Sequence, residues 1–367
     1  DIGFRREGLI QVANMDRAVV IPLYETLMRE VARVPGVESV GASIVKIAGD
    51  QTLNTNVRVP GNPQPMVIGF YSANPEFFRT AGLRLLAGRT LSGQFANDNA
   101  FTPYLDDEAR LAAARQIQGR GINVVVNEAA VRRMGLGNPS AALGRQISLN
   151  AFGEEVGLVP ATIVGIVADT RFHSLREPVE PSIFYDSGIY SDMLIRYSSS
   201  NPEAVRRAVG DVWRRVVETI PYEGEFTDAR LADLYAGDAA RGRTFAAFTL
   251  LAVVIACLGL FGLAAFTAER RTKEIGIRKV FGARSRDIVR LLAWQFSKPV
   301  IIANLIAWPA AWWVMRNWLN TFDERIDLGP TPFVLAGLLA LAIALGTVSG
   351  HALRVSRTNP INALRYE

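Results

Sequence analysis

Residues that could do chemistry by themselves are few and widely spaced in this sequence. The chain contains 2 histidines, His173 and His351, and 1 cysteine, Cys257. Two histidines cannot supply a histidine-rich metal site, and one thiol forms neither an intramolecular disulfide nor a structural cysteine-metal site. No spacing indicates the serine, histidine and carboxylate of a catalytic triad. We therefore predict no catalytic, cofactor-binding or metal-binding residue, and we expect the histidines at a surface or an interface.

The densest carboxylate group is Asp106, Asp107 and Glu108. It could be a paired-carboxylate site, but acids in a row are also typical of a solvated loop or of a helix start, where they face the positive end of the dipole. We assign it no chemistry. The chain also lacks a GxxxxGK[ST] phosphate-binding loop and is not a P-loop ATPase by itself. ATPase activity, if the chain depends on it, would reside in a partner protein or domain.

Three long apolar stretches occupy the last third of the chain. Phe245 to Ala268 has no charge over about 24 residues, Leu291 to Met315 is interrupted only by Lys298, and Thr331 to Gly350 is charge-free over about 20 residues. A large soluble core with three buried helices is the alternative, but such helices rarely stay uncharged for so long. We predict an all-α membrane domain, 245–367, with transmembrane helices at 245–268, 288–316 and 331–352.

The charges of the connecting segments predict the orientation. The first connection, 269–287, is strongly basic, whereas the second sets Arg316 and Arg325 against three acids. Positively charged loops remain cytoplasmic. We therefore expect the first connection and the tail 353–367 inside, and residues 1–240 outside the membrane. Four tryptophans agree with this orientation, because they cluster where the second span would meet the outer interface: Trp308, Trp312, Trp313 and Trp318.

The region before the spans reads as a mixed α+β domain. Two strand-like runs are followed by helices with one apolar face, which is the pattern of βαβ-like units. The apolar positions of the two helices are Val19, Leu23, Leu27 and Val31, and Val205, Val209, Val212 and Val216. We predict an extracytoplasmic domain of two subdomains over 1–240. Residues 1–74 and 161–227 form the first, 75–160 form an inserted second, and 228–244 form a stalk.

Composition and the start of the chain complete this picture. The formal net charge is +5 and the sequence pI is about 9.5. Much of the basic surplus lies beside the spans, so anionic lipid and membrane orientation explain it and a nucleic-acid partner is not expected. Asp1 to Val12 contains no apolar stretch that could direct the outer region across a membrane. We expect the chain to be the C-terminal part of a longer polypeptide.

Several phrases carry a family resemblance. The run Ala268 to Arg284, AERRTKEIGIRKVFGAR, and the terminal NPINALRYE resemble the permease subunits of MacB/FtsX-type ABC transporters. Phrases of the outer region resemble the MacB-like periplasmic domain of that family: VPGVESV, FFRTAG, AGRT, VGIVAD and the pair Glu180-Pro181. The opening DIGFRREGLI resembles the start of the outer domain in the second module of a fused permease. The resemblance covers nearly the whole chain.

The resemblance implies a permease subunit in the bacterial inner membrane, with its N-terminal region periplasmic and its C-terminus cytoplasmic. ATP and Mg would be bound by an ABC-type ATP-binding subunit, and no cofactor by this chain. Further partners would be a second permease module, fused upstream or as a homodimer, membrane lipid and a periplasmic protein. The function would be ATP-driven export or extraction of an amphipathic substrate, such as a drug, a peptide or a lipid-linked molecule. The alternative is a non-transporting, FtsX-like regulatory complex that activates cell-wall hydrolases.

Two groups of residues are candidates for contacts. In the first connection, a short basic helix with apolar edges would dock on the ATPase, although a plain positive-inside loop or contact with the membrane interface would use the same residues. These ATPase-coupling candidates are Glu274, Ile275, Gly276, Ile277, Arg278, Lys279, Phe281, Gly282 and Ala283. Small residues let membrane helices approach closely. The helix-interface candidates are Ala252, Ala256, Gly259, Gly346 and Gly350.

Overall fold

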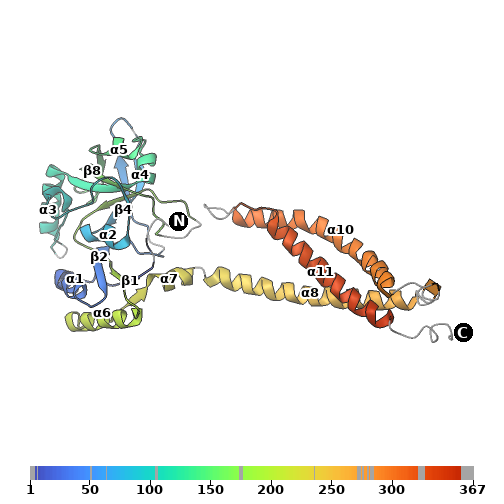
Figure 1. Ribbon diagram of the computed structural model, residues 1–367. Coiled ribbons are helices and arrows are strands. Elements are labelled where there is room, and N and C mark those ends of the chain that lie inside the picture. The colour runs from blue at the N-terminus through green and yellow to red at the C-terminus, as the bar shows by residue number, and fades with distance from the viewer. Residues whose placement is uncertain are drawn as a thin grey trace. The chain divides into compact units, whose positions relative to one another are not determined.

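The computed structural model describes residues 5–356 except for 6, 50–51, 63, 104–105, 173–176, 235, 271–273, 275–276, 279–280, 282–284 and 321–326. These residues form two compact units, Asp1–Ala236 and Gly237–Glu367. All the strands assigned in the described residues belong to the first unit, whereas the second unit is helical (Figure 1). The division into an α+β domain and an all-α membrane domain is therefore confirmed.

The first sheet interleaves the two predicted βαβ-like units. Its strands run in the order β11-β1-β10-β2, and each strand is antiparallel to its neighbours. Their bounds are Leu9–Val12 (β1), Val37–Ser43 (β2), Asp192–Tyr197 (β10) and Gly224–Phe226 (β11). Helix α1, Tyr24–Ala32, joins β1 to β2, and α6, Pro202–Val216, joins β10 to β11. Each helix thus joins two parallel strands with one strand of the other unit between them, as in ferredoxin-like folds.

The two helices share one core with this sheet. Leu27 and Val31 of α1 and Val209 of α6 are fully buried against Ile10 and Ile195 of the strands. Val19, expected on the same apolar face as Leu27, is instead 53% exposed. Pro22 explains the difference, because the chain forms a short 3-10 turn, Ile21–Leu23, before α1 begins at Tyr24.

The second sheet has seven strands and closes on itself. Its order is β5-β8-β6-β9-β4-β3-β7, and β7 pairs again with β8. The pairs β4–β9 and β6–β8 are parallel, and the other pairs are antiparallel. The bounds are Asn54–Arg58 (β3), Met66–Ser72 (β4), Leu85–Gly88 (β5), Ile122–Asn127 (β6), Gln146–Leu149 (β7), Val159–Val167 (β8) and Ser182–Tyr185 (β9).

This sheet corrects the predicted bounds of the inserted part. Its strands run from Asn54 to Tyr185, so the expected insertion, 75–160, is too short at both ends. The cause is the pairing of β4 with β9, which joins Gly69 to Ser182. No local pattern encodes a pair so distant in sequence, because strand periodicity reports which side of a strand is buried and not its neighbour.

Helix α2, Pro75–Ala81, lies between the two sheets. Phe77 and Phe78 are buried in a cluster with Leu194 of the first sheet and Phe184 of the second. Gly41 of β2 allows this approach, because a Cβ there would lie 2.7 Å from the Cα of Phe77. The remaining helices of the unit are η2 (Ala96–Asp98), α3 (Asp107–Arg120), α4 (Glu128–Arg133), α5 (Pro139–Ala142) and α7 (Thr227–Leu234).

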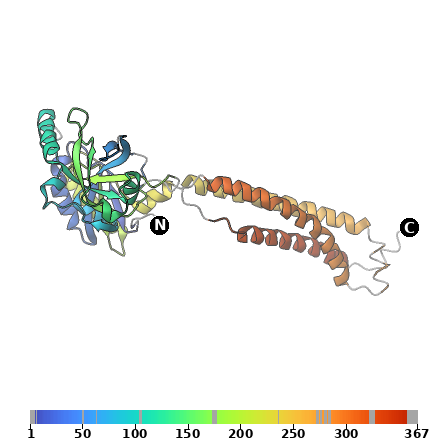
Figure 2. The ribbon, with the colours of Figure 1, turned by 90° about the horizontal axis from the view of Figure 1, so that it is seen from above.

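The second unit contains α8, Ala236–Arg270, α10, Ser285–Leu319, and α11, Thr331–Ser356. All three are long and apolar enough to cross a membrane, which agrees with the three predicted spans. Helix α10 packs along α11 and curves along its length (Figures 1 and 2). Pro299 and Pro309 lie inside α10, and a proline bends a helix because it removes a backbone donor.

Candidate functional site

The predicted ATPase-coupling segment lies between α8 and α10. Glu274, Ile277, Arg278 and Phe281 are described, and the other five candidates lie outside the described residues: Ile275, Gly276, Lys279, Gly282 and Ala283. The backbone N–H of Phe281 donates to the carbonyl of Ile277 at 3.1 Å, and Arg278 pairs with Glu274 at 2.8 Å. Both contacts span four residues, as in a helical turn.

This turn presents apolar side chains to the surroundings. Phe281 is 86% exposed and Ile277 is 47% exposed, with the Glu274–Arg278 pair beside them. An exposed phenylalanine on a helical turn is a suitable anchor for a hydrophobic groove on another protein. The described part of the segment therefore has the geometry of a docking element, and the role of its residues stays a prediction.

Four of the five predicted helix-interface residues are exposed in the described part of this chain. Ala252, Ala256 and Gly259 of α8 are exposed, and so is Gly346 of α11. A Cβ added at Gly259 or Gly346 would meet nothing within 4 Å. Gly350 lies in α11, but its surroundings are outside the described residues. Contacts of these residues with a second permease module remain a prediction.

Helix contacts within the unit occur elsewhere. Ala264 of α8 is buried against Val348 of α11, with Val289 and Phe296 of α10 packed beside them. A closer approach occurs at Gly337 of α11, where an added Cβ would lie 2.9 Å from Cζ2 of Trp308. Sequence reasoning missed Gly337 and placed Trp308 at the outer interface. The polar residue Asn304 could have indicated this contact, because it lies in an apolar span one helical turn before Trp308 and also faces Gly337.

The acid cluster of the outer unit has a structural role. Oδ1 of Asp106 accepts a hydrogen bond from the backbone N–H of Ala109 at 2.9 Å, so Asp106 caps α3. Asp107 in the first turn pairs with Arg110 at 3.3 Å. The interpretation of these acids as a helix start is confirmed. Among the residues the structure describes, no group of three histidine, cysteine or acidic side chains could hold a metal ion.

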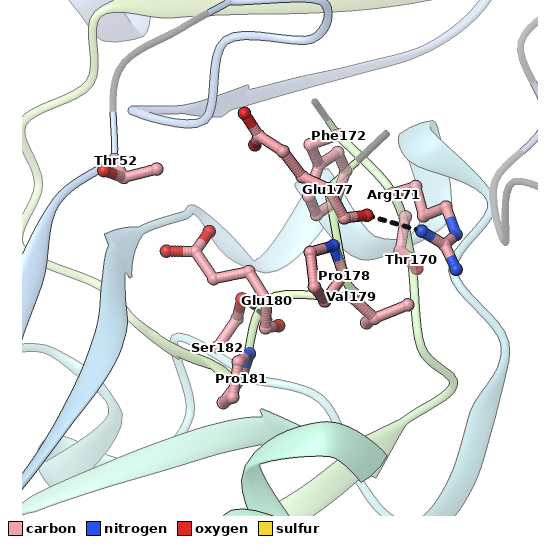
Figure 3. Close-up of a pocket in the computed structure, with 10 residues that line it drawn as sticks. All are labelled: Thr52, Thr170, Arg171, Phe172, Glu177, Pro178, Val179, Glu180, Pro181 and Ser182. Carbon is pink, nitrogen blue, oxygen red and sulfur yellow. Dashed lines mark hydrogen bonds between the residues drawn. The ribbon is translucent and has the colours of Figure 1, made fainter. Parts of the chain in front are cut away.

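A cavity of about 280 Å³ lies beside the connection between β8 and β9 (Figure 3). Nη1 of Arg171 donates to the carbonyl of Glu177 at 2.7 Å, and Glu180 accepts from the hydroxyl of Tyr71 at 2.5 Å. Burial and the bonded Glu180 carboxylate raise the pKa of Tyr71, so this hydroxyl is a donor and not a base. The charged groups of the cavity thus hold the connection in place, and we assign the cavity no reaction.

The two ends of the outer unit are held close together. Arg196 of β10 is 5% exposed, and its guanidinium donates to the carbonyls of Thr80 at 2.7 Å, Glu7 at 3.0 Å and Arg5 at 2.9 Å. This attaches the segment before β1 to α2. At the same edge Ile10 of β1 pairs with Phe226 of β11, after which α7 begins. The start of β1 and the end of β11 therefore lie at neighbouring positions.

The membrane unit is similar to a known protein family. Residues 246–360, which include α8, α10, α11 and the exposed connection, match the FtsX-like permease C-terminal model. The C-terminal part of this chain is an FtsX-like permease domain. The resemblance inferred from AERRTKEIGIRKVFGAR is thereby confirmed at family level.

Relatives extend the similarity into the outer unit. The macrolide export ATP-binding/permease protein MacB of Chromobacterium violaceum is 23% identical over 303 residues, which cover 80% of this chain and 42% of that protein. The pyoverdine export ATP-binding/permease protein PvdT of Pseudomonas entomophila is 28% identical over 258 residues, 62% of this chain and 38% of that protein. This chain thus spans about two fifths of the length of these relatives.

Two solved structures of outer domains are similar to part of this chain. The periplasmic region of MacB from Actinobacillus actinomycetemcomitans covers 61% of this chain and 91% of that structure, with 11% identity and a TM-score of 0.39. The extracellular domain of the transporter YknZ from Gram-positive bacteria covers 59% of this chain and 99% of that structure, with 12% identity and a TM-score of 0.37.

Proposed function

We propose that this chain is the permease module of an ABC transporter, in which ATP hydrolysis by a separate subunit or domain moves the outer unit. The observation that carries the proposal is helix α8. It is a single helix of 35 residues that contains a membrane-length apolar stretch and precedes the exposed coupling turn. At 1.5 Å per residue it is about 50 Å long, against about 30 Å of hydrocarbon, so it extends well beyond one side of the bilayer.

The coupling turn is the contact through which the ATPase would act. ATP and Mg would be bound by that partner; the relatives MacB and PvdT are ATP-binding/permease proteins. On this chain, Phe281 and Ile277 supply apolar contact area, and the Glu274–Arg278 pair supplies charges of both signs at its rim. An apolar anchor surrounded by a polar rim is typical of a protein interface.

The membrane helices fit force transmission better than a polar conduit. The hydroxyls of Thr249, Ser297 and Thr347 each donate to the carbonyl four residues earlier in the same helix, at 2.8, 2.7 and 2.9 Å. Such bonds satisfy the polar side chains within their own helix, whereas a conduit needs polar groups that face its lumen. We therefore infer that the substrate is an amphipathic molecule handled by the outer unit, and that α8 transmits the movement to it.

The test is to separate the chain from its ATPase. Phe281→Asp or Ile277→Asp places a charge in the apolar contact, and each should lower co-purification of the ATPase about tenfold and abolish substrate-stimulated ATP hydrolysis. Phe95→Asp is the matched control, because Phe95 is a 46%-exposed phenylalanine of the outer unit. Wild-type co-purification and stimulation in both variants would overturn the proposal.

The same complex distinguishes transport from regulation. In proteoliposomes, ATP-dependent movement of an amphipathic probe such as a macrolide supports export or extraction. Activation of a cell-wall hydrolase without any movement of such probes would instead support the FtsX-like regulatory role.

A further inference from the structure

A groove of about 700 Å³ lies in the membrane unit where the first half of α10 faces α11. Its lining is polar at one end and apolar along the rest. The polar end is formed by Arg278, Asp287 and Arg290, and the rest is lined by Ser297 and by apolar residues: Leu291, Ala293, Trp294, Ile301, Leu341 and Leu345. Asp287 and Ile301 are about 21 Å apart along the helix at 1.5 Å per residue. The groove is therefore long enough for an extended acyl chain.

The apolar part of the groove is open. Trp294 is 61% exposed, and Leu291 and Ile301 are 37% and 39% exposed. An open apolar strip on a membrane-length helix faces acyl chains, because water does not enter the hydrocarbon core. The occupant must therefore carry an apolar chain.

The charged end of the groove selects the headgroup. Two guanidinium groups can hold a phosphate through paired hydrogen bonds, and basic pockets between transmembrane helices bind lipid headgroups. Arg278 is already paired with Glu274, but this pair is half exposed and such pairs contribute little, so the guanidinium is available to a phosphate. Lys298 is a further cation of α10, about two turns beyond Arg290, with Nζ 5.8 Å from the ring centroid of Trp294.

Asp287 further restricts which lipid headgroup fits the charged end of the groove. Its carboxylate lies at the same end of the groove as Arg290. It would repel a headgroup that carries only negative charge, whereas it can accept hydrogen bonds from an ammonium group next to the phosphate, in addition to its existing contact. Two arginines and one carboxylate thus match a zwitterionic headgroup with a primary amine.

We propose that this groove binds one phospholipid with a primary-amine headgroup, from the leaflet on the side of the coupling turn. Its phosphate contacts Arg290 and Arg278, its ammonium contacts Asp287, and one acyl chain lies along Trp294, Leu341 and Leu345. The site belongs to the membrane unit alone and needs no ATPase. Its test is therefore independent of the proposed transport function.

Native mass spectrometry of the complete detergent-purified protein measures the binding, with dioleoyl phosphatidylethanolamine, phosphatidylglycerol and phosphatidylcholine as separate probes. The wild type should retain one phosphatidylethanolamine in preference to either other lipid. Arg290→Gln should weaken that binding about tenfold, because it removes a charge-assisted contact with the phosphate. Arg316→Gln is the matched control, since Arg316 lies at the other end of α10 with its guanidinium over Trp312.

Two further variants test the other contacts. Asp287→Asn should abolish the preference for phosphatidylethanolamine over phosphatidylglycerol while lipid is still retained. Leu345→Trp should fill the groove and remove retention of all three probes, whereas Leu338→Trp, at a 58%-exposed position of α11 outside the groove lining, should not. Thermal unfolding within a few degrees of the wild type shows that a variant is folded.

Three results would overturn the proposal. Stronger retention of phosphatidylglycerol than of phosphatidylethanolamine by the wild type would show that the occupant is an anionic lipid. Equal retention by the wild type and Arg290→Gln would show that this charged end binds no phosphate. Unchanged retention in folded Leu345→Trp would place the lipid elsewhere on the protein.

Discussion

At the scale of single residues, Asp186 is a partly buried carboxyl that follows β9. It accepts hydrogen bonds from the hydroxyl of Tyr190 and, at 3.0 Å, from the backbone N–H of Gly188. Burial raises the pKa of Asp186, and the negative charges of Glu76 and Asp98 raise it further, whereas the two hydrogen bonds lower it. The net result is a pKa above the ordinary value of 3.8. The charged form is therefore unfavourable in the folded protein.

The direction of this shift predicts a pH dependence. Between pH 3.8 and the raised pKa of Asp186, the folded protein binds more protons than the unfolded chain, so its contribution to stability falls as pH rises. Asp186→Asn keeps an acceptor for Tyr190 without a charge. We expect it to raise the free energy of unfolding at pH 7 and to make stability less dependent on pH, measured by denaturant titrations from pH 4 to pH 8. A loss of stability at pH 7 as large as at pH 4 would contradict this account.

At the scale of elements, the approach of α10 to α11 depends on Gly337. A side chain there must displace the indole of Trp308, because an added Cβ would lie 2.9 Å from it. We expect Gly337→Leu to destabilise the helix pair by about 1–3 kcal/mol, the usual effect of overpacking, measured by thermal unfolding in detergent. Gly346→Leu is the control, since the space beside Gly346 is open.

The control variant also tests a predicted interface. If Gly346 contacts a second permease module, Gly346→Leu should preserve the unfolding temperature but reduce assembly of the complex in size-exclusion chromatography. Equal destabilisation by both leucine substitutions would show that the close contact at Gly337 has no special role.

Helix α8 is the second element with a predicted mechanical role. Residues 236–244, expected as part of a stalk, form its first turns, and α7 is a separate helix that packs on β1 and β11. Inserting Gly-Gly-Ser-Gly after Gly237 should abolish substrate output but leave basal ATPase activity, because a flexible linker transmits little torque. The same insertion after Gly153, an exposed glycine of the outer unit, should preserve both. Full output from the Gly237 insertion would exclude a lever.

At the scale of the whole molecule, the distribution of charge predicts the orientation in the membrane. The basic first connection predicts that residues 1–240 lie outside and 269–287 inside. In a background without Cys257, a cysteine at Asp107 should react with an impermeant thiol reagent after the outer membrane is permeabilised, since that side chain is 91% exposed. A cysteine at Lys273 should react only after the inner membrane is opened. Labelling of the Lys273 position in intact inner membranes would reverse the topology.

Features that depend on neighbouring residues could be predicted from the sequence. Helices α8, α10 and α11 contain the predicted spans, because a membrane-length apolar run is a local property. The apolar face of α6 and the cap at Asp106 were readable for the same reason, since both depend on residues within one or two turns. The phrase between the first two spans also sufficed to indicate the family that residues 246–360 match.

Contacts between segments that are distant in sequence could not be predicted and come from the folded structure. The pairing of Gly69 with Ser182 extends the second sheet beyond 75–160. The described helices meet at Ala264 and Gly337, whereas the candidates Ala252, Ala256, Gly259 and Gly346 are exposed. Strand periodicity shows which face is buried but not which strand lies beside it. A stripe of small residues likewise shows where a helix could be approached, whereas the contact itself depends on the shape of the partner, here the indole of Trp308 over Gly337.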